Sequence, residues 1–155
     1  MPHERMHAAW DGDRAVGGAG SFPFELTVPG GRGRAAGIKM VGVLPSHRRR
    51  GVLRDMMRAQ LDACHACGEP VAYLWATEDT IYGRFGYGIG SFAAEVEVPR
   101  DRSGYHGLLP APAGRQAEAR LIPLEKGEDL LGPIWERVAA ETPGMFSRTT
   151  AWWQV

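Results

Sequence analysis

The spacing of apolar residues divides the first part of the chain into short strands around one helix. Residues 10–29 are predicted to form a hairpin, because 11–13 is an Asp-Gly-Asp turn signal and apolar residues alternate with others before the Pro-Gly-Gly that ends the segment. The apolar run 38–44 is short and bounded by turn residues, which predicts a buried strand. From 49 to 67 the apolar spacing becomes helical, and Gly68 follows where a helix-ending glycine belongs.

Three shorter patterns follow that helix. Residues 71–76 are apolar and rich in strand formers, and they predict a further strand. Asp79 is placed to cap a short helix that runs to about Arg84. In residues 94–98 apolar residues alternate with Glu95 and Glu97, which predicts a half-buried strand with both carboxylates in solvent. Strands mixed with helices in this order predict an α/β (α+β) domain over residues 1–99.

The rest of the chain predicts a linker and the start of a second domain. Residues 100–117 are rich in glycine, proline and arginine, and residues 118–155 contain a predicted strand at 120–122 and a helix near 128–141. The expected buried face of that helix consists of Leu130, Leu131, Ile134, Trp135 and Val138. Adjacent tryptophans near the end, Trp152 and Trp153, favour a truncated second domain, because such side chains are costly to leave in water.

Composition excludes several classes of protein. Lys and Arg total 18 and Asp and Glu total 18, so no net charge attracts the chain to nucleic acid or to a membrane surface. No apolar run has the roughly 20 residues that span a bilayer, and the first residues do not resemble a signal peptide. Two cysteines form no disulfide framework, so a cytoplasmic location is expected.

The most informative local feature is a cluster of arginines where a helix begins. Residues 41–54 join the end of a predicted strand, a turn, the run Arg48-Arg49-Arg50 and Gly51, and the helix follows. Helix N-termini carry unpaired N–H groups and a positive dipole end, so arginines there are unfavourable unless an anion offsets them. A diphosphate is the natural anion, and Gly51 would allow close backbone approach. A solvated basic turn and a nucleic-acid patch are the alternatives, while the phosphate-loop pattern G-x-x-x-x-G-K-[ST] is missing.

A second cluster contains an aromatic residue that could transfer protons. Tyr82 belongs to the segment Ile81-Tyr-Gly-Arg-Phe-Gly-Tyr-Gly88 and follows a predicted strand end. A phenol, with a reference pKa of about 10, is a suitable proton donor to a departing thiolate. By itself, however, a tyrosine in such a position is more often a packed aromatic residue than a proton donor.

Together the two clusters resemble a known family. Arg48-x-x-Gly51-x-Leu53 is similar to the R/Q-x-x-G-x-G/A diphosphate loop of the GNAT acetyltransferases and departs from it at Leu53, where small residues are usual. The longer strings V-x-V-L-P-S-H-R-R-R-G-V-L-R and I-Y-G-R-F-G-Y-G resemble the enhanced-intracellular-survival (Eis) acetyltransferases over roughly residues 10–150. The resemblance implies the GNAT acyl-CoA N-acyltransferase fold, with a mixed, mostly antiparallel sheet and flanking helices, truncated at both ends.

The resemblance also implies which residues bind acetyl-CoA and which act on it. A strand backbone would pair with the pantetheine at Val41, Gly42 and Val43. The diphosphate would lie on the segment Arg48, Arg49, Arg50, Gly51, Val52, Leu53 and Arg54. Thr77 and Glu78 would lie beside the thioester, an N–H near Val43 would stabilise the oxyanion, and Tyr82 would be the general acid.

The implied reaction is direct transfer of an acetyl group to a primary amine, either of an aminoglycoside or of a lysine side chain. Full-length relatives of this kind form homo-oligomers. The family's first strand and two helices are expected to be absent here, and Val155 cannot act as the terminal-carboxylate base, which leaves the base unassigned. A non-catalytic CoA-binding or assembly fragment is therefore the alternative function.

A cysteine pair and a histidine could support other chemistry. Cys64 and Cys67 have C-x-x-C spacing but no second pair, so core packing is favoured over a metal site, and no metal is expected. His47 is interpreted as an exposed turn residue that could also contact phosphate.

Overall fold

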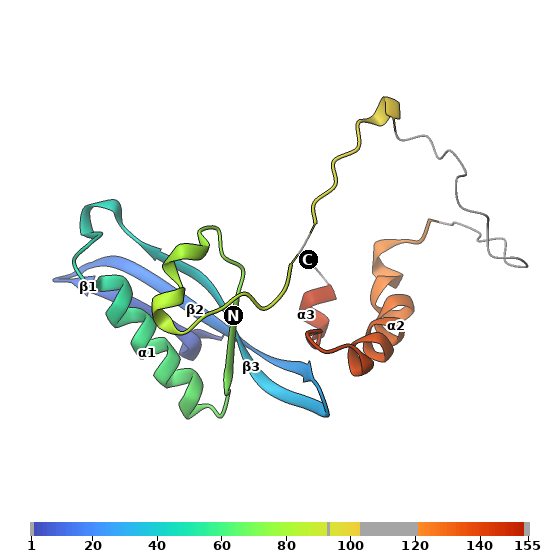
Figure 1. Cartoon of the computed structure of the whole chain (residues 1–155), viewed down its shortest axis with the longest axis horizontal. Helices are drawn as coiled ribbons and strands as arrows, with labels where there is room; N and C mark the ends of the chain where they lie inside the picture. The colour runs from blue at the N-terminus through green and yellow to red at the C-terminus, as the bar shows by residue number, and fades with distance from the viewer. Residues whose placement is uncertain (1, 93, 103–120, 154–155) are drawn as a thin grey trace, which may run out of the picture.

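The computed structural model describes residues 2–92, 94–102 and 121–153, and Figure 1 shows their arrangement. The sheet contains β1 (Met6–Asp11), β2 (Arg14–Val28), β3 (Gly31–Val43) and β4 (Val71–Leu74), in that order. The first three strands are antiparallel, and β4 is parallel to β3. This mixed, mostly antiparallel sheet with flanking helices confirms the predicted fold class.

Two hairpins build the antiparallel part of the sheet. The predicted hairpin at 10–29 is confirmed, with β1 beginning earlier, at Met6. Gly12 in its turn has φ +62°, a conformation that favours glycine. A second turn with Gly30 at φ +93° joins β2 to β3, which starts at Gly31 rather than at the predicted residue 38. Cross-strand pairing with β2 explains the added length, because residues 31–37 pair with 22–28.

Helix α1 (Val52–Ala66) crosses from β3 to β4 and packs along the sheet, as Figure 1 shows. Its buried residues follow the helical spacing that the sequence predicted over 49–67: Met56, Met57, Gln60 and Cys64. Gly68 adopts φ +71° after the last turn, as expected for a helix-ending glycine. Cys67 is exposed rather than packed in the core.

The segment after β4 differs from the prediction. Instead of one capped helix it forms two 3₁₀ turns, η3 (Asp79–Ile81) and η4 (Gly83–Phe85). Asp79 lies inside the first turn, the residue before it is Glu78, and no side chain caps the turn. Gly86 at φ +88° ends the second turn. The prediction of a strand at 94–98 is wrong. Among the described residues no segment pairs with 94–98, and Val96 is 79% exposed.

The C-terminal part contains η6 (Leu124–Lys126), α2 (Gly127–Glu141) and α3 (Thr150–Trp153), after η5 (Arg100–Arg102) earlier in the chain. The predicted helix at 128–141 is confirmed as α2, but residues 121 and 122 form no strand. Thr27 on β2 joins this part to the sheet, since its Oγ1 donates to the Ala139 carbonyl at 2.6 Å and its N–H donates to the Met145 carbonyl.

The predicted burial of the α2 stripe is wrong. Leu130, Leu131, Ile134 and Val138 are each between 42% and 50% exposed, Trp135 is half-buried, and Ala139 is the buried residue of the helix. Thr27 Oγ1 reaches the backbone carbonyl of Ala139, and Trp135, one turn earlier on the same side of α2, is the half-buried member of the stripe, so the predicted face is covered only in part. Residues 103–117 of the predicted linker lie outside the described residues, and the domain boundaries stay predictions.

The tryptophans near the end are half-buried rather than free in solvent. Trp152 packs on the rings of Phe22 and Phe24, at centroid distances of 5.5 and 5.4 Å. Trp153 packs edge-on against Trp135. Within the described part of the chain, no helix is long and apolar enough to cross a membrane.

Candidate cofactor cleft

The cleft begins where two neighbouring strands stop pairing. The parallel pairing of β3 with β4 ends at Ile38 and Leu74, but β3 continues to Val43. Within the described part of the chain, residues 39–43 of β3 therefore have no strand beside them on the β4 side. Figure 1 shows the chain after β4 leaving the sheet at this level. An unpaired edge of this kind presents free backbone donors and acceptors.

A bulge at the same level turns β3. Gly18 pairs with Gly42 and Gly20 pairs with Lys39, so β3 has one more residue than β2 between these pairs. Met40 lies in the bulge and has φ +59°, which is uncommon for a residue other than glycine. Bulges bend a strand and increase its twist, and this one lies where β3 loses its partner β4.

The backbone of Val43 faces the open edge. The N–H of Leu44 donates to the Val16 carbonyl on β2 at 2.8 Å. Successive N–H groups of a strand point to opposite edges, so the N–H of Val43 points away from β2. The unpaired edge therefore offers an N–H donor beside the start of the loop.

The loop after β3 places several arginines at the start of α1. It passes through η2 (Pro45–His47), and Arg49 adopts φ +61°. Gly51, at φ +86°, is the N-cap of α1, and no side chain caps the helix. The first backbone bond of the helix is from the Asp55 N–H to the Gly51 carbonyl at 3.1 Å, so the preceding amides have no intrahelical partner. Free amides at an uncapped helix start, with arginines beside them, are suited to binding an anion.

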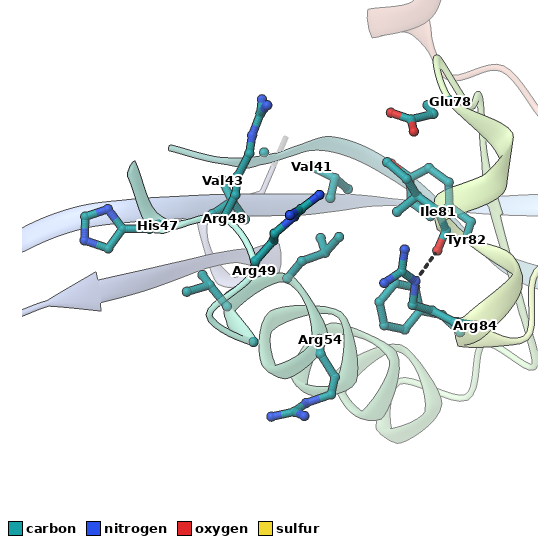
Figure 2. Close-up of a pocket in the computed structure, with 15 residues that line it drawn as sticks. Val41, Val43, His47, Arg48, Arg49, Arg54, Glu78, Ile81, Tyr82 and Arg84 are labelled. Carbon is teal, nitrogen blue, oxygen red and sulfur yellow. Dashed lines mark hydrogen bonds between the residues drawn. The ribbon is translucent and has the colours of Figure 1, made fainter. Parts of the chain in front are cut away.

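Strand edge, loop and helix start enclose one cleft of about 480 Å³. Figure 2 shows Arg48 and Arg49 on the loop, and Tyr82 and Glu78 on the segment that faces it. The lining residues are Val41, Gly42, Val43, His47, Arg48, Arg49, Gly51, Val52, Leu53, Arg54, Glu78, Ile81, Tyr82, Arg84 and Phe85. Most of the residues predicted from sequence therefore lie together.

Two predicted site residues do not line the cleft. The Arg50 Nη1 atom lies 3.7 Å from Asp11 Oδ2. The same carboxylate oxygen lies 3.0 Å from His47 Nε2. Arg50 lines a second hollow, between β1 and α1. Thr77 is exposed and does not line the cleft. The three consecutive arginines thus divide, with Arg48 and Arg49 on one side and Arg50 on the other.

The candidate general acid is held by a second tyrosine. The Tyr82 and Tyr87 rings meet edge to face with centroids 5.8 Å apart, and the Tyr87 N–H donates to the Tyr82 carbonyl at 3.4 Å. Tyr87 packs against the core of Ile38 and Cys64. Burial, followed by the charges of Cys64 and Tyr82, raises the pKa of Tyr87 to about 12. Tyr82 is therefore the half-buried phenol that lines the cleft, and Tyr87 is the phenol behind it.

The cleft also contains residues for which no role in binding was predicted. Ile81, Arg84 and Phe85 line it beside Tyr82. A signal was present in the I-Y-G-R-F-G-Y-G string, whose arginine precedes an aromatic residue, but linear spacing does not show which wall a side chain joins. Among the described residues no group of three or more His, Cys, Asp or Glu side chains is placed to hold a metal ion. Burial raises the pKa of the Cys64 thiol.

Comparisons with known proteins agree with this geometry. The family model of the acetyltransferase (GNAT) domain matches residues 1–90 of the sequence. An uncharacterized N-acetyltransferase of Streptomyces avermitilis is 45% identical over 96% of this chain and 36% of its own length. The N-acetyltransferase Eis of Mycobacterium tuberculosis is 36% identical over 94% of this chain and 36% of its own length.

A solved structure gives the same result. The crystal structure of Eis1 from Mycobacterium abscessus has a TM-score of 0.75 and 35% identity, and the match covers 99% of this chain and 38% of that one. This chain spans little more than a third of the length of these relatives. The sheet, the arginine loop and the matching family model together show that the chain belongs to the GNAT acetyltransferase family.

Proposed function

We propose that the protein is an acetyl-CoA-dependent N-acetyltransferase that acts on a primary amine. The observation that carries the proposal is the joining of an open strand edge, an uncapped helix start and two arginines in one cleft. An aminoglycoside or a lysine side chain is the acceptor implied by the resemblance to Eis. Assembly into a homo-oligomer stays a prediction from the same resemblance, and a cytoplasmic setting fits the two free cysteines.

The residues present fit the two polar parts of acetyl-CoA. The free edge of β3 at Val41–Val43 matches the amides of pantetheine, which can pair with a strand backbone. The amides after Gly51, with Arg48 and Arg49, match the diphosphate. A Cβ at Gly51 would lie 3.2 Å from Arg54 Nη2 and would strain the positive φ, so glycine keeps this cradle open.

The reaction proceeds by direct attack on the thioester. The neutral amine nitrogen forms a bond to the carbonyl carbon, and the Val43 N–H stabilises the negative charge that develops on oxygen. The C–S bond then breaks, and the Tyr82 hydroxyl donates its proton to the departing sulfur. The surplus proton on nitrogen leaves through water, and the base remains unassigned. The phenolate of Tyr82 regains its proton from solvent.

Coenzyme binding is tested by calorimetry with acetyl-CoA. The chain is expected to bind it saturably, and Arg49→Ala combined with Gly51→Asp is expected to abolish binding, because this removes a cation and adds an anion where the diphosphate lies. Arg34→Gln is a matched control, since Arg34 is exposed near the opposite end of β3. Folded wild-type protein that gives no binding heat would refute the proposal.

The role of Tyr82 is tested by thiol release from acetyl-CoA in the presence of an aminoglycoside. Tyr82→Phe is expected to lower the rate by about 100-fold or more, the range typical of general acids, with little change in coenzyme affinity. Tyr73→Phe, at a half-buried tyrosine that does not line the cleft, is the control. Coenzyme binding without any thiol release by the wild type would support instead a non-catalytic CoA-binding or assembly role.

A further inference from the structure

One cation of the cleft has no role in the proposed chemistry. Arg84 lies on η4, on the wall that faces the arginine loop. Figure 2 shows its side chain pointing into the cleft below Tyr82, across from Arg49. It therefore reaches the cleft from an element different from the one that carries Arg48 and Arg49.

The geometry leaves the end of this side chain free to bind. Arg84 Nε donates to the Ile81 carbonyl at 2.9 Å, and its Cζ lies 5.8 Å from the centre of the Phe85 ring. These contacts fix the guanidinium through one nitrogen. Among the described residues its two terminal nitrogens make no ion pair or hydrogen bond that would occupy them. A planar, pre-oriented pair of N–H groups of this kind suits the oxygens of a phosphate.

The charges that line the cleft favour binding of an anion that both walls can reach. Arg48, Arg49, Arg54 and Arg84 face it, and Glu78 is the one carboxylate among its lining residues. Arg54 is already paired with Asp55 at 3.0 Å. Cations on facing walls repel each other across a shared hollow unless an anion lies between them.

Coenzyme A carries two separate phosphate groups, a diphosphate and a phosphate on the 3′ carbon of its ribose. If the loop and the start of α1 hold the diphosphate, one cation on the other wall remains for the second group. We propose that Arg84 binds the 3′-phosphate, and that it thereby selects coenzyme A over forms that lack this group. This inference rests on the proposed function, because it concerns the same coenzyme.

The test compares coenzyme A with 3′-dephospho-coenzyme A by calorimetry on the full chain. The wild type is expected to bind coenzyme A more tightly than the dephospho form. Arg84→Gln is expected to weaken binding of coenzyme A by roughly tenfold to a hundredfold, as for loss of a charged hydrogen bond, and to leave binding of the dephospho form within about twofold. Arg84→Lys keeps the charge without the two-pronged geometry and should lose less. Arg34→Gln, outside the cleft, should bind both ligands as the wild type does.

Each outcome separates this inference from the function on which it rests. Equal loss of affinity for both ligands in Arg84→Gln, or no loss for either, would overturn the role of Arg84 while coenzyme binding stands. Failure of the wild type to bind either ligand would refute the coenzyme proposal itself. Because Arg84 is exposed, its variants should keep the wild-type unfolding transition, and circular dichroism checks this.

Discussion

At the scale of single residues, two tyrosines five positions apart have different surroundings. Tyr82 lines the cleft, whereas the Tyr87 hydroxyl is buried and has no hydrogen-bond partner among the described residues. A buried hydroxyl without a partner costs free energy, so its apolar packing must offset that cost. The Tyr87 ring, which meets Tyr82 edge to face, therefore supports the orientation of Tyr82 without reaching the cleft.

Removing the Tyr87 hydroxyl should change the pH dependence of stability. Burial raises its pKa in the folded chain to about 12, while the unfolded phenol ionises near 10. The raised pKa means that stability is fully present below pH 10 and is lost between pH 10 and 12, where only the unfolded state ionises. Tyr87→Phe should therefore reduce the alkaline loss, and should keep or raise the free energy of unfolding at pH 7 by about 1 kcal/mol.

Urea unfolding at pH 7 and pH 11 measures both effects. Tyr73→Phe serves as the control for the loss of a tyrosine elsewhere. Parallel loss of stability in the wild type and Tyr87→Phe between these pH values would contradict the assignment.

At the scale of elements, α2 shows that a helical period does not determine which face is buried. Its large aliphatic residues are 42% to 50% exposed, whereas Ala139, whose carbonyl accepts a hydrogen bond from Thr27 on β2, is 1% exposed. Segment 94–98 shows that a strand pattern is likewise insufficient. Alternating apolar and polar residues form a strand only if a neighbouring strand supplies hydrogen bonds. By contrast, the α1 stripe predicted the buried side correctly, because α1 follows directly from the sheet that it covers.

Substitutions on α2 should follow this burial. Ile134 is 50% exposed, so Ile134→Lys should change the free energy of unfolding of this chain by no more than about 0.5 kcal/mol. Ala139→Asp should cost about 2 kcal/mol or more, because it places a carboxylate at a position that is 1% exposed. Urea titration followed by tryptophan fluorescence measures both. A larger effect from Ile134→Lys than from Ala139→Asp would show that the docked face is misassigned.

At the scale of the whole molecule, a buried ion pair joins the start of the chain to the connection between α1 and β4. Arg5 Nη2 lies 2.5 Å from Glu69 Oε2, and Arg5 Nε donates to the Ser21 hydroxyl at 3.1 Å. The Glu69 side chain is 1% exposed. Since the partners are 64 residues apart, the contact closes the fold around the end of α1.

Breaking this pair should destabilise the chain strongly. Glu69→Gln leaves the Arg5 cation buried without a charged partner, and the expected cost is about 3 kcal/mol. Glu95→Gln, at an exposed position, is the control and should be close to neutral. Thermal unfolding at low and high salt measures the difference, which should persist at high salt because the pair is buried. An effect no larger than that of the control would mean that the pair contributes little.

The sequence alone determined the features that depend on neighbouring residues. Gly12 and Gly68 lie where turn and helix-end patterns predict them, and the arginine run lies at the start of α1. Local backbone preferences and the spacing of apolar residues determine such features without reference to distant parts of the chain. The core of the cleft was predictable for the same reason, because Val41 to Arg54 form one continuous segment.

Only the tertiary structure decided which distant residues meet. It turned Arg50 toward Asp11 while Arg48 and Arg49 face the cleft, and it brought Arg84 to the opposite wall. It also gave residues 94–98 no strand partner among the described residues, and it placed Ala139 of α2 against Thr27. These outcomes depend on the pairing of strands and on the direction of side chains across a gap, and residue order alone specifies neither of them.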